Sequence, residues 1–158
     1  MGNLCCLENV EENLYKPVYA QIVSRDSKVV ASMCPVNLEC NLVIRGRDIK
    51  HMPGSPEVHL NGPGSYEVTL ITTASLSSVS GAFVTCGISL YIGANKLLAT
   101  SVKETLPLSL SGGAVYANLS TKTIVNIAEE SELTLLVMND SGISLNYCNT
   151  NLIIYKLE

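Results

Sequence analysis

The chain has 158 residues, a formal net charge of −4, and a composition that is 47% hydrophobic but only 15% charged. This length fits one domain with a substantial core, and the apolar content excludes an intrinsically disordered chain. Phosphate binding requires clustered lysine and arginine, and the sequence has no basic run, so we expect no nucleic-acid partner. The low charge density favours a protein that buries surface against other subunits, although one well-packed domain would have a similar composition.

The first sixteen residues differ from the rest of the chain. They are rich in Glu and Asn, and Pro17 separates them from the first expected strand, residues 18–23. They lack a basic start and an uninterrupted apolar core, so we expect no cleavable signal peptide. No apolar stretch reaches the roughly 18–20 residues of a membrane-spanning helix. We therefore predict an N-terminal connector arm over residues 1–16 and one folded domain over residues 17–158.

Alternating apolar residues predict several strands after the arm. In residues 38–44, 66–70 and 84–92 every second residue is apolar, which is typical of a strand with one buried face. Segments rich in Gly, Asn, Asp and Ser separate these strands and predict tight turns. No amphipathic helix stands out. The pattern predicts an all-β protein built as an antiparallel sandwich or barrel.

One further strand, residues 133–138, is apolar on both of its sides. Such a strand is covered on both faces. A loop or the N-terminal arm could provide the second cover, but we favour a second subunit. The predicted subunit interface therefore comprises Leu4, Leu133, Leu135, Leu136, Val137 and Met138.

Several segments resemble the jelly roll of the tumour-necrosis-factor and complement-globular-head superfamily. The stretch EVHLNGPGSYEVTLITTAS has the apolar strand, Pro-Gly turn and aromatic-led strand of that fold, and ISLYIGANKLLAT, TKTIVNIAEESELTLLVMND and NLIIYKLE continue the pattern. The resemblance covers about residues 18–158 and is nearest to the heads of bacterial collagen-like spore-surface glycoproteins, although this chain has no Gly-X-Y stalk. It implies an antiparallel jelly-roll β-sandwich that forms a homo-oligomer, either a trimer or a helical or stacked fibre.

The arm resembles the N-terminal connectors of endospore appendage subunits, in which an apolar residue and paired cysteines bridge successive jelly-roll units. Cys5 and Cys6 follow Leu4 in this chain. Adjacent cysteines rarely bond each other, because the geometry is strained, so both need partners elsewhere. Cys34 and Cys148 lie off the apolar stripes and are the predicted acceptors of intermolecular disulfides.

The remaining two cysteines lie on apolar stripes of expected strands. Cys40 and Cys86 are therefore predicted to be buried free thiols, since an unpaired cysteine behaves as a small hydrophobic residue. The spacing between Cys34 and Cys40 does not match a zinc knuckle, and no His is close in sequence.

Support for catalysis is weak. His51 and His59 are the only histidines, and both lie near turns. No serine lies in a nucleophile-elbow pattern, and no carboxylate pair or calcium loop can be assigned. We expect no enzyme activity, no metal and no cofactor. Two Asn-X-Ser triplets begin at Asn118 and Asn139, and neither is expected to be glycosylated.

Three functions are compatible with these observations. The first is a structural subunit that self-assembles into an extracellular fibre or appendage, by resemblance on a spore surface, joined by N-terminal arms and intermolecular disulfides. The second is a trimeric ligand-recognition head of a surface or phage fibre. The third is a membrane-tethered module with lipids on Gly2 and on Cys5 or Cys6, which Cys6 argues against because the myristoylation pattern prefers Ser or Thr there.

Overall fold

The computed structural model describes residues 17–76, 83–107, 113–128 and 132–157. Predictions for Leu4, Cys5, Cys6 and the arm over residues 1–16 lie outside the described residues. The described part of the chain is almost entirely strand, and its one helical element is the short 3-10 turn Leu98–Thr100. The strands are β1 (Tyr19–Ser24), β2 (Lys28–Val30), β3 (Cys40–Arg45), β4 (Ile49–His51), β5 (Glu57–Asn61), β6 (Gly64–Leu76), β7 (Phe83–Ile92), β8 (Asn95–Lys96), β9 (Val102–Pro107), β10 (Val115–Ile127), β11 (Glu132–Asn139) and β12 (Leu145–Lys156).

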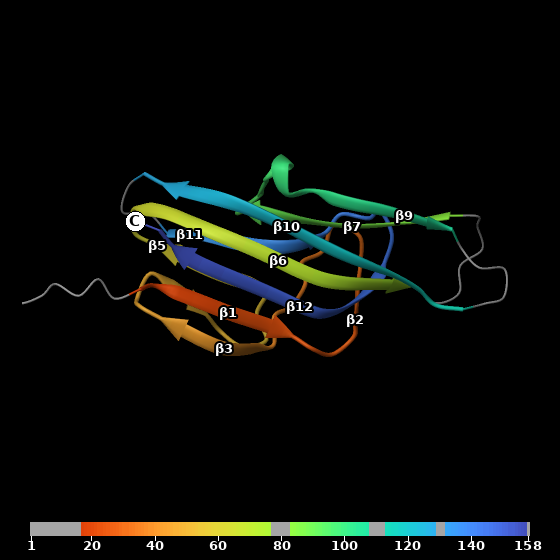
Figure 1. Cartoon of the computed structure of the whole chain (residues 1–158), viewed down its shortest axis with the longest axis horizontal. Coiled ribbons are helices and arrows are strands. Elements are labelled where there is room, and N and C mark those ends of the chain that lie inside the picture. The colour runs from red at the N-terminus through yellow and green to blue at the C-terminus, as the bar shows by residue number, and fades with distance from the viewer. Residues whose placement is uncertain (1–16, 77–82, 108–112, 129–131, 158) are drawn as a thin grey trace, which may run out of the picture.

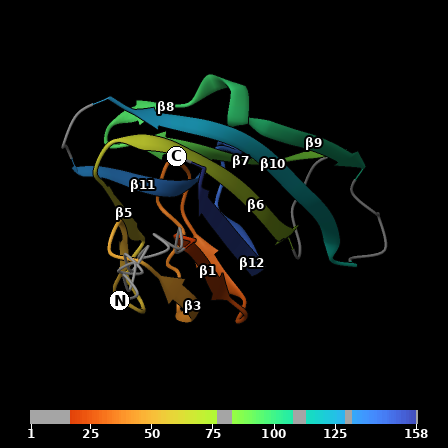
Figure 2. The ribbon, with the colours of Figure 1, turned by 60° about the vertical axis from the view of Figure 1, so that its left-hand side comes forward.

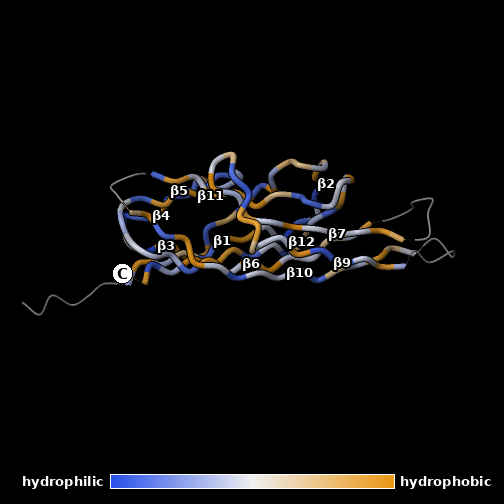
Figure 3. Tube along the Cα trace, turned by 90° about the horizontal axis from the view of Figure 1, so that it is seen from above, coloured by the Kyte–Doolittle hydropathy of each residue, from blue (hydrophilic) through white to orange (hydrophobic). Residues whose placement is uncertain are grey.

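The strands form two antiparallel sheets that pack face to face (Figures 1 and 3). Sheet A has the order β10-β6-β12-β1-β3, and β2 pairs with β12 beside β1. Sheet B has the order β4-β5-β11-β7-β8, and β9 pairs with β7. The predicted all-β antiparallel sandwich is confirmed.

The core lies between the sheets and follows from the alternation of side chains along each strand. In β6, Tyr66, Val68 and Leu70 are fully buried, and in β7 the same holds for Ile88 and Leu90. Successive side chains of a strand point to opposite faces, so one apolar stripe per strand is enough to build this core. The colouring in Figure 3 follows this alternation between hydrophobic and hydrophilic residues along the strands.

A polar network closes the turn that follows β11. Asn139 is fully buried, and its side-chain amide donates to the carbonyl oxygens of Val30 and Ile143 at 2.9 and 2.8 Å. The Tyr147 hydroxyl donates to the carbonyl of Gly87 at 2.5 Å and also contacts Asn139. A Cβ at Gly87 would lie 2.8 Å from the carbonyl oxygen of Asp140, so the strand approaches this turn closely only because residue 87 is glycine.

Asp140 holds this turn to the neighbouring loop. Its carboxylate accepts bonds from Lys96 Nζ at 2.5 Å and Ser101 Oγ at 2.7 Å, and Lys103 Nζ lies 3.7 Å away. These partners hold the pKa of Asp140 below its usual value, although burial alone would raise it. The partners of these buried side chains all lie within the same chain, so the role of this network is structural.

A β-bulge corrects the prediction for Cys40. The register between β1 and β3 shifts at Gln21 and Ile22, so Leu42 is an extra residue in β3. A bulge of this kind reverses the alternation for the residues before it. Cys40 therefore faces away from the core and is exposed, whereas the sequence predicted a buried thiol.

Candidate interaction surface

The side of sheet A that faces away from the core is the most extensive candidate site, and we call it the sheet A face. The register of the strands brings its side chains into rows: Ser120, Ile71 and Asn151 lie side by side, as do Ile124, Glu67, Tyr155 and Tyr19. Figure 1 views the molecule from this side, with β10, β6, β12, β1 and β3 in the foreground. The face comprises Tyr19, Gln21, Glu67, Thr69, Ile71, Thr73, Asn118, Ser120, Lys122, Ile124, Asn151, Ile153 and Tyr155.

Apolar and aromatic side chains lie among the polar residues of this face. Ile71, Ile124 and Tyr155 are 46%, 55% and 47% exposed, and Ile153, next to Tyr155 on the same side of β12, is half-buried. Glu67 separates Ile124 from Tyr155, and Ser120 and Asn151 flank Ile71. The rings of Tyr155 and Tyr19 stack with their centroids 5.8 Å apart. Single exposed apolar residues are common on protein surfaces, but a cluster spread over adjacent strands marks an interaction surface.

The two charges among the residues of this face, Lys122 and Glu67, neutralise each other. Lys122 Nζ lies 2.8 Å from a carboxylate oxygen of Glu67. At the margin, the Arg45 guanidinium lies 5.8 Å from the centre of the Tyr19 ring, a cation–π contact. All other members of the face are uncharged, so a partner needs no complementary charge to bind it.

An open pocket of mixed polar and apolar lining, with a cavity volume of about 200 Å³, lies beside these residues. Two β-bulges meet there, one in the β1–β3 pairing and one in β12 between Cys148 and Asn151. Asn149, within the second bulge, has a left-handed φ of 50°, a conformation that asparagine adopts more readily than most residues other than glycine. The pocket is lined by Gln21, Val23, Ser24, Arg25, Leu42, Asn149, Thr150 and Asn151.

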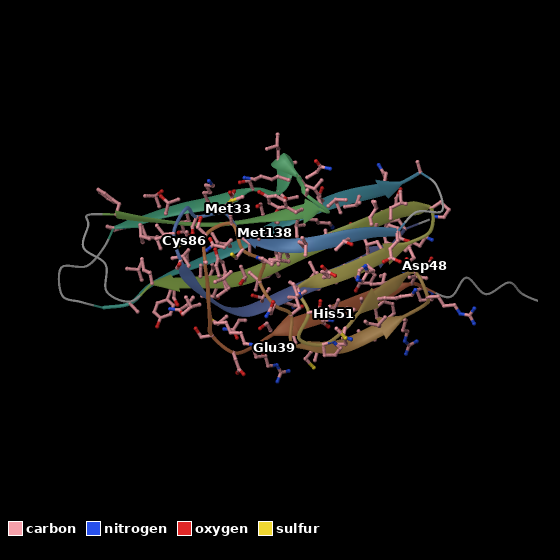
Figure 4. The ribbon with its side chains drawn as sticks, turned by 180° about the vertical axis from the view of Figure 1, so that it is seen from behind. Met33, Glu39, Asp48, His51, Cys86 and Met138 are labelled. Atoms are coloured by element: carbon pink, nitrogen blue, oxygen red, sulfur yellow. The ribbon has the colours of Figure 1, made fainter. Side chains whose placement is uncertain are left out.

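The strand that the sequence predicted as an interface, β11, lies inside sheet B. Leu135 and Val137 point into the core and are fully buried, and Leu133 packs against that core. Leu136, half-buried, and Met138 point to the other side of the sheet. The segment around Pro35 forms a β-bridge with Met138, and Met33 lies beside it (Figure 4). A chain segment therefore lies next to β11, and its covering by a second subunit stays a prediction.

The four cysteines that the structure describes are all free. Cys34 and Cys40 are exposed, Cys148 is partly exposed on the sheet A side, and Cys86 is buried. Burial raises the pKa of the Cys86 thiol, which keeps it protonated and unreactive. The predicted acceptors Cys34 and Cys148 thus keep accessible sulfur atoms, but their pairing with the arm lies outside the described residues.

The two histidines lie in different environments. His51 is buried between the sheet edges, where its Nε2 donates to the carbonyl of Ser55 at 3.0 Å and its Nδ1 lies 2.5 Å from Oδ1 of Asn41. Burial lowers the pKa of His51. His59 is more exposed and lies 2.7 Å from a carboxylate oxygen of Glu132. His51 contacts the backbone carbonyl of Ser55, whereas the Ser55 hydroxyl accepts a bond from the Glu57 amide at 3.1 Å.

The described residues hold no group of three or more His, Cys, Asp or Glu side chains arranged to bind a metal ion. Of the two Asn-X-Ser triplets, Asn139 is buried with its amide engaged, and a glycan could not reach it. Asn118 is exposed on β10, where its amide oxygen accepts a bond from Thr73 Oγ1 at 2.9 Å. The described segments also contain no helix with the length and hydrophobicity that a membrane crossing requires.

Sequence reasoning missed the sheet A face. It predicted no separate strand over residues 121–127, whereas they are the second half of the thirteen-residue strand β10. The period-two pattern of residues along β10 was the sequence signal that could have revealed this strand and its outward side.

Comparison with known proteins supports the fold. No family model matches the chain, and no curated protein sequence matches it. Among solved structures, Eiger TNF from S. frugiperda has a TM-score of 0.60 at 11% identity, over 90% of this chain and 93% of that one. Murine APRIL at pH 5.0 has a TM-score of 0.52 at 13% identity, over 90% of this chain and all of that one. The chain therefore has a tumour-necrosis-factor-like jelly-roll fold, as the sequence predicted.

The buried His51 predicts an acid-dependent loss of stability. Its pKa in the folded protein lies below the ordinary value of 6.5, so folding favours the neutral ring. The free energy of unfolding should be constant above about pH 7 and fall as the pH drops below about 6.5. Denaturant titrations between pH 8 and pH 5 measure it. This window avoids Asp140 and Glu39, whose pKa values are lowered and whose contributions are lost only in stronger acid.

The variant for this measurement is His51→Gln, which should flatten the profile between pH 6.5 and pH 5. A profile that is equally steep in the parent and in His51→Gln would contradict the assignment.

Proposed function

We propose that the chain is a non-catalytic head domain that works outside the cell and associates with copies of itself through the sheet A face. The observation that carries this proposal is the cluster of Ile71, Ile124, Ile153 and Tyr155, which lies exposed or half-buried on adjacent strands of one sheet. Burying such a cluster removes apolar area from water, which is the main driving force of association. The resemblance of the fold to the tumour-necrosis-factor superfamily favours a trimer.

A second copy is the partner that fits the charges of this face best. Lys122 and Glu67 neutralise each other within one chain. In a trimer this face packs against a different surface of the neighbouring copy, and apart from Arg45 at its margin the face brings no unpaired charge into that contact. A strongly acidic or basic partner would gain nothing here. The function that follows is a multivalent head for recognition at a surface.

A second candidate function is a fibre subunit joined by disulfides, as the sequence analysis proposed for a spore-surface appendage. The observation in its favour is that Cys34 is exposed and Cys148 partly exposed, and neither forms a disulfide within the described residues. Cys5 or Cys6 of another copy could bond to them in oxidising surroundings. An arm of about sixteen residues, extended at ~3.3 Å per residue, spans on the order of 50 Å.

The first test changes the apolar cluster. The double variant Ile71→Asp/Tyr155→Asp should shift the protein from oligomer to monomer in sedimentation velocity, because each interface would then bury two introduced carboxylates. Both side chains are about half exposed, so circular dichroism and thermal unfolding should stay close to the parent.

Two controls locate the surface. Met52 and Leu98 are 73% and 80% exposed and lie off the sheet A face, so Met52→Asp/Leu98→Asp should leave the oligomer intact. Leu136→Asp probes the face that the sequence predicted. If Leu136→Asp gives monomers and Ile71→Asp/Tyr155→Asp does not, copies associate through sheet B and our proposal is wrong.

The second test addresses the fibre. If the arm cross-links copies, the full chain should give reductant-sensitive species that resist boiling detergent, and Cys5→Ser/Cys6→Ser and Cys34→Ser/Cys148→Ser should abolish them. Cys40→Ser, which removes another exposed thiol, is the control and should keep them. Detergent-resistant species of unchanged amount in Cys5→Ser/Cys6→Ser would rule out the cross-link, while the head function would stand.

A further inference from the structure

The two β-bulges of sheet A create a hollow at the margin of the sheet, where β12, β1 and β3 lie side by side (Figures 1 and 2). Leu42 is the extra residue of one bulge and Asn149 belongs to the other, and both line the pocket of about 200 Å³ described above. A bulge bends its strand and re-aims a side chain, and bulges are frequent next to functional sites. The strand pairing therefore builds this hollow, and we call it the bulge pocket.

The base of the bulge pocket is formed by its buried lining residues, Val23, Ser24 and Thr150. The Thr150 hydroxyl lies 2.7 Å from Thr72 Oγ1, so it already has a partner inside the sandwich. Leu42, which is 47% exposed, adds an apolar side chain to the lining. Val23 and Leu42 therefore offer apolar surface to the C–H groups of a ligand.

The charge of the bulge pocket comes from one side chain. Of the described residues that line it, only Arg25 is charged. Arg25 is exposed, and no carboxylate of the described residues lies within ion-pair distance of it. In a second hollow, beside β2, Lys28 is already paired with Glu39. The Arg25 guanidinium therefore keeps its positive charge and its N–H donors for a ligand.

Three amide side chains of the bulge pocket have hydrogen-bonding capacity left. The Gln21 amide nitrogen donates to Asn151 Oδ1 at 3.3 Å, which leaves Gln21 Oε1 and Asn151 Nδ2 without a partner in the described structure. Asn149 Nδ2 makes a long contact of 3.9 Å with Cys148 Sγ. A primary amide both donates and accepts hydrogen bonds, as a hydroxyl group does, so these side chains suit a ligand rich in hydroxyl groups.

These groups select a ligand with one negative charge. A guanidinium binds a carboxylate through two parallel hydrogen bonds. An amino acid would fit poorly, because the lining has no acidic residue to receive its ammonium group. The cavity volume equals that of about six or seven water molecules at ~30 Å³ each, so the pocket admits one sugar ring rather than an extended ligand.

We propose that the bulge pocket binds a sugar that carries one carboxylate, such as a uronic acid. The carboxylate lies on Arg25, the ring hydroxyls bond to the amides of Asn149 and Asn151, and a C–H face of the ring contacts Leu42. Gln21 and Asn151 also belong to the sheet A face, so the ligand lies next to the surface through which copies associate. The site is formed within one chain and does not depend on that association.

Two sugars that differ at one carbon test this chemistry. D-Glucuronate and D-glucose share their ring and hydroxyl groups, and the sixth carbon is a carboxylate in the first and a hydroxymethyl group in the second. Glucuronate should shift the NMR amide signals of residues 23–25 and 149–151 in the isotope-labelled full chain, and glucose should bind about tenfold more weakly or not at all. The titrations use the parent and Ile124→Asp/Tyr155→Asp, whose changes disfavour contact between copies in a different row of the face from Asn151.

Variants of the lining assign the contacts. Arg25→Gln should raise the dissociation constant for glucuronate about tenfold or more and remove the preference over glucose, because a charge-assisted hydrogen bond is lost. Asn149→Gly removes an amide but keeps a left-handed backbone that glycine adopts freely, and it should raise the constant about threefold. Arg47→Gln, which changes an exposed arginine outside the pocket, is the matched control and should leave the constant unchanged.

Three results would overturn the proposal. They are equal binding of the two sugars, no shifted signals in either the parent or Ile124→Asp/Tyr155→Asp, and an unchanged dissociation constant for glucuronate in Arg25→Gln. The sheet A face has its own test in Ile71→Asp/Tyr155→Asp, so the failure of one proposal is distinguishable from the failure of the other.

Discussion

The alternation of side chains along the long strands of sheet A is the constraint on which the rest of the structure depends. In β6, β10 and β12 every second residue is committed to the core between the sheets, except where the bulge in β12 intervenes. Apolar residues in the other positions, such as Ile71 and Ile124, cannot reach that core without shifting the register by one residue and exposing the first set. Only another molecule could bury them, which is why the sheet A face is the main candidate for function.

Much of the fold could be predicted from the sequence, because period-two stripes and turn residues mark antiparallel strands directly. β7 and the middle of β6 lie where their alternation placed them. The prediction was wrong at Cys40, because a bulge depends on how β3 pairs with β1, and that pairing joins residues about twenty positions apart. The sheet A face was missed because β10 and β12 contribute to it from distant parts of the chain, and their register with β6 cannot be deduced from either segment alone.

The surfaces of the molecule differ in whether their polar groups have partners within the chain. The turn around Asn139 and Asp140 is buried, and its side chains are bonded to lysines, a tyrosine and backbone carbonyls. This turn therefore closes one end of the sandwich, and its role is structural. The sheet A face instead presents apolar side chains to solvent. Association of copies would bury this apolar area.

Hydroxyl-radical footprinting at two protein concentrations tests the central claim most directly, because it measures the exposure of individual side chains in the unmodified chain. Our account predicts that oxidation of Tyr155 and Ile71 falls as the protein assembles, while oxidation of Met52 and Leu98 stays constant. Those four side chains are all exposed in the single chain, so each one reports on what covers it. Equal oxidation of all four at both concentrations, in a sample shown to be oligomeric, would place the contact elsewhere and contradict the account.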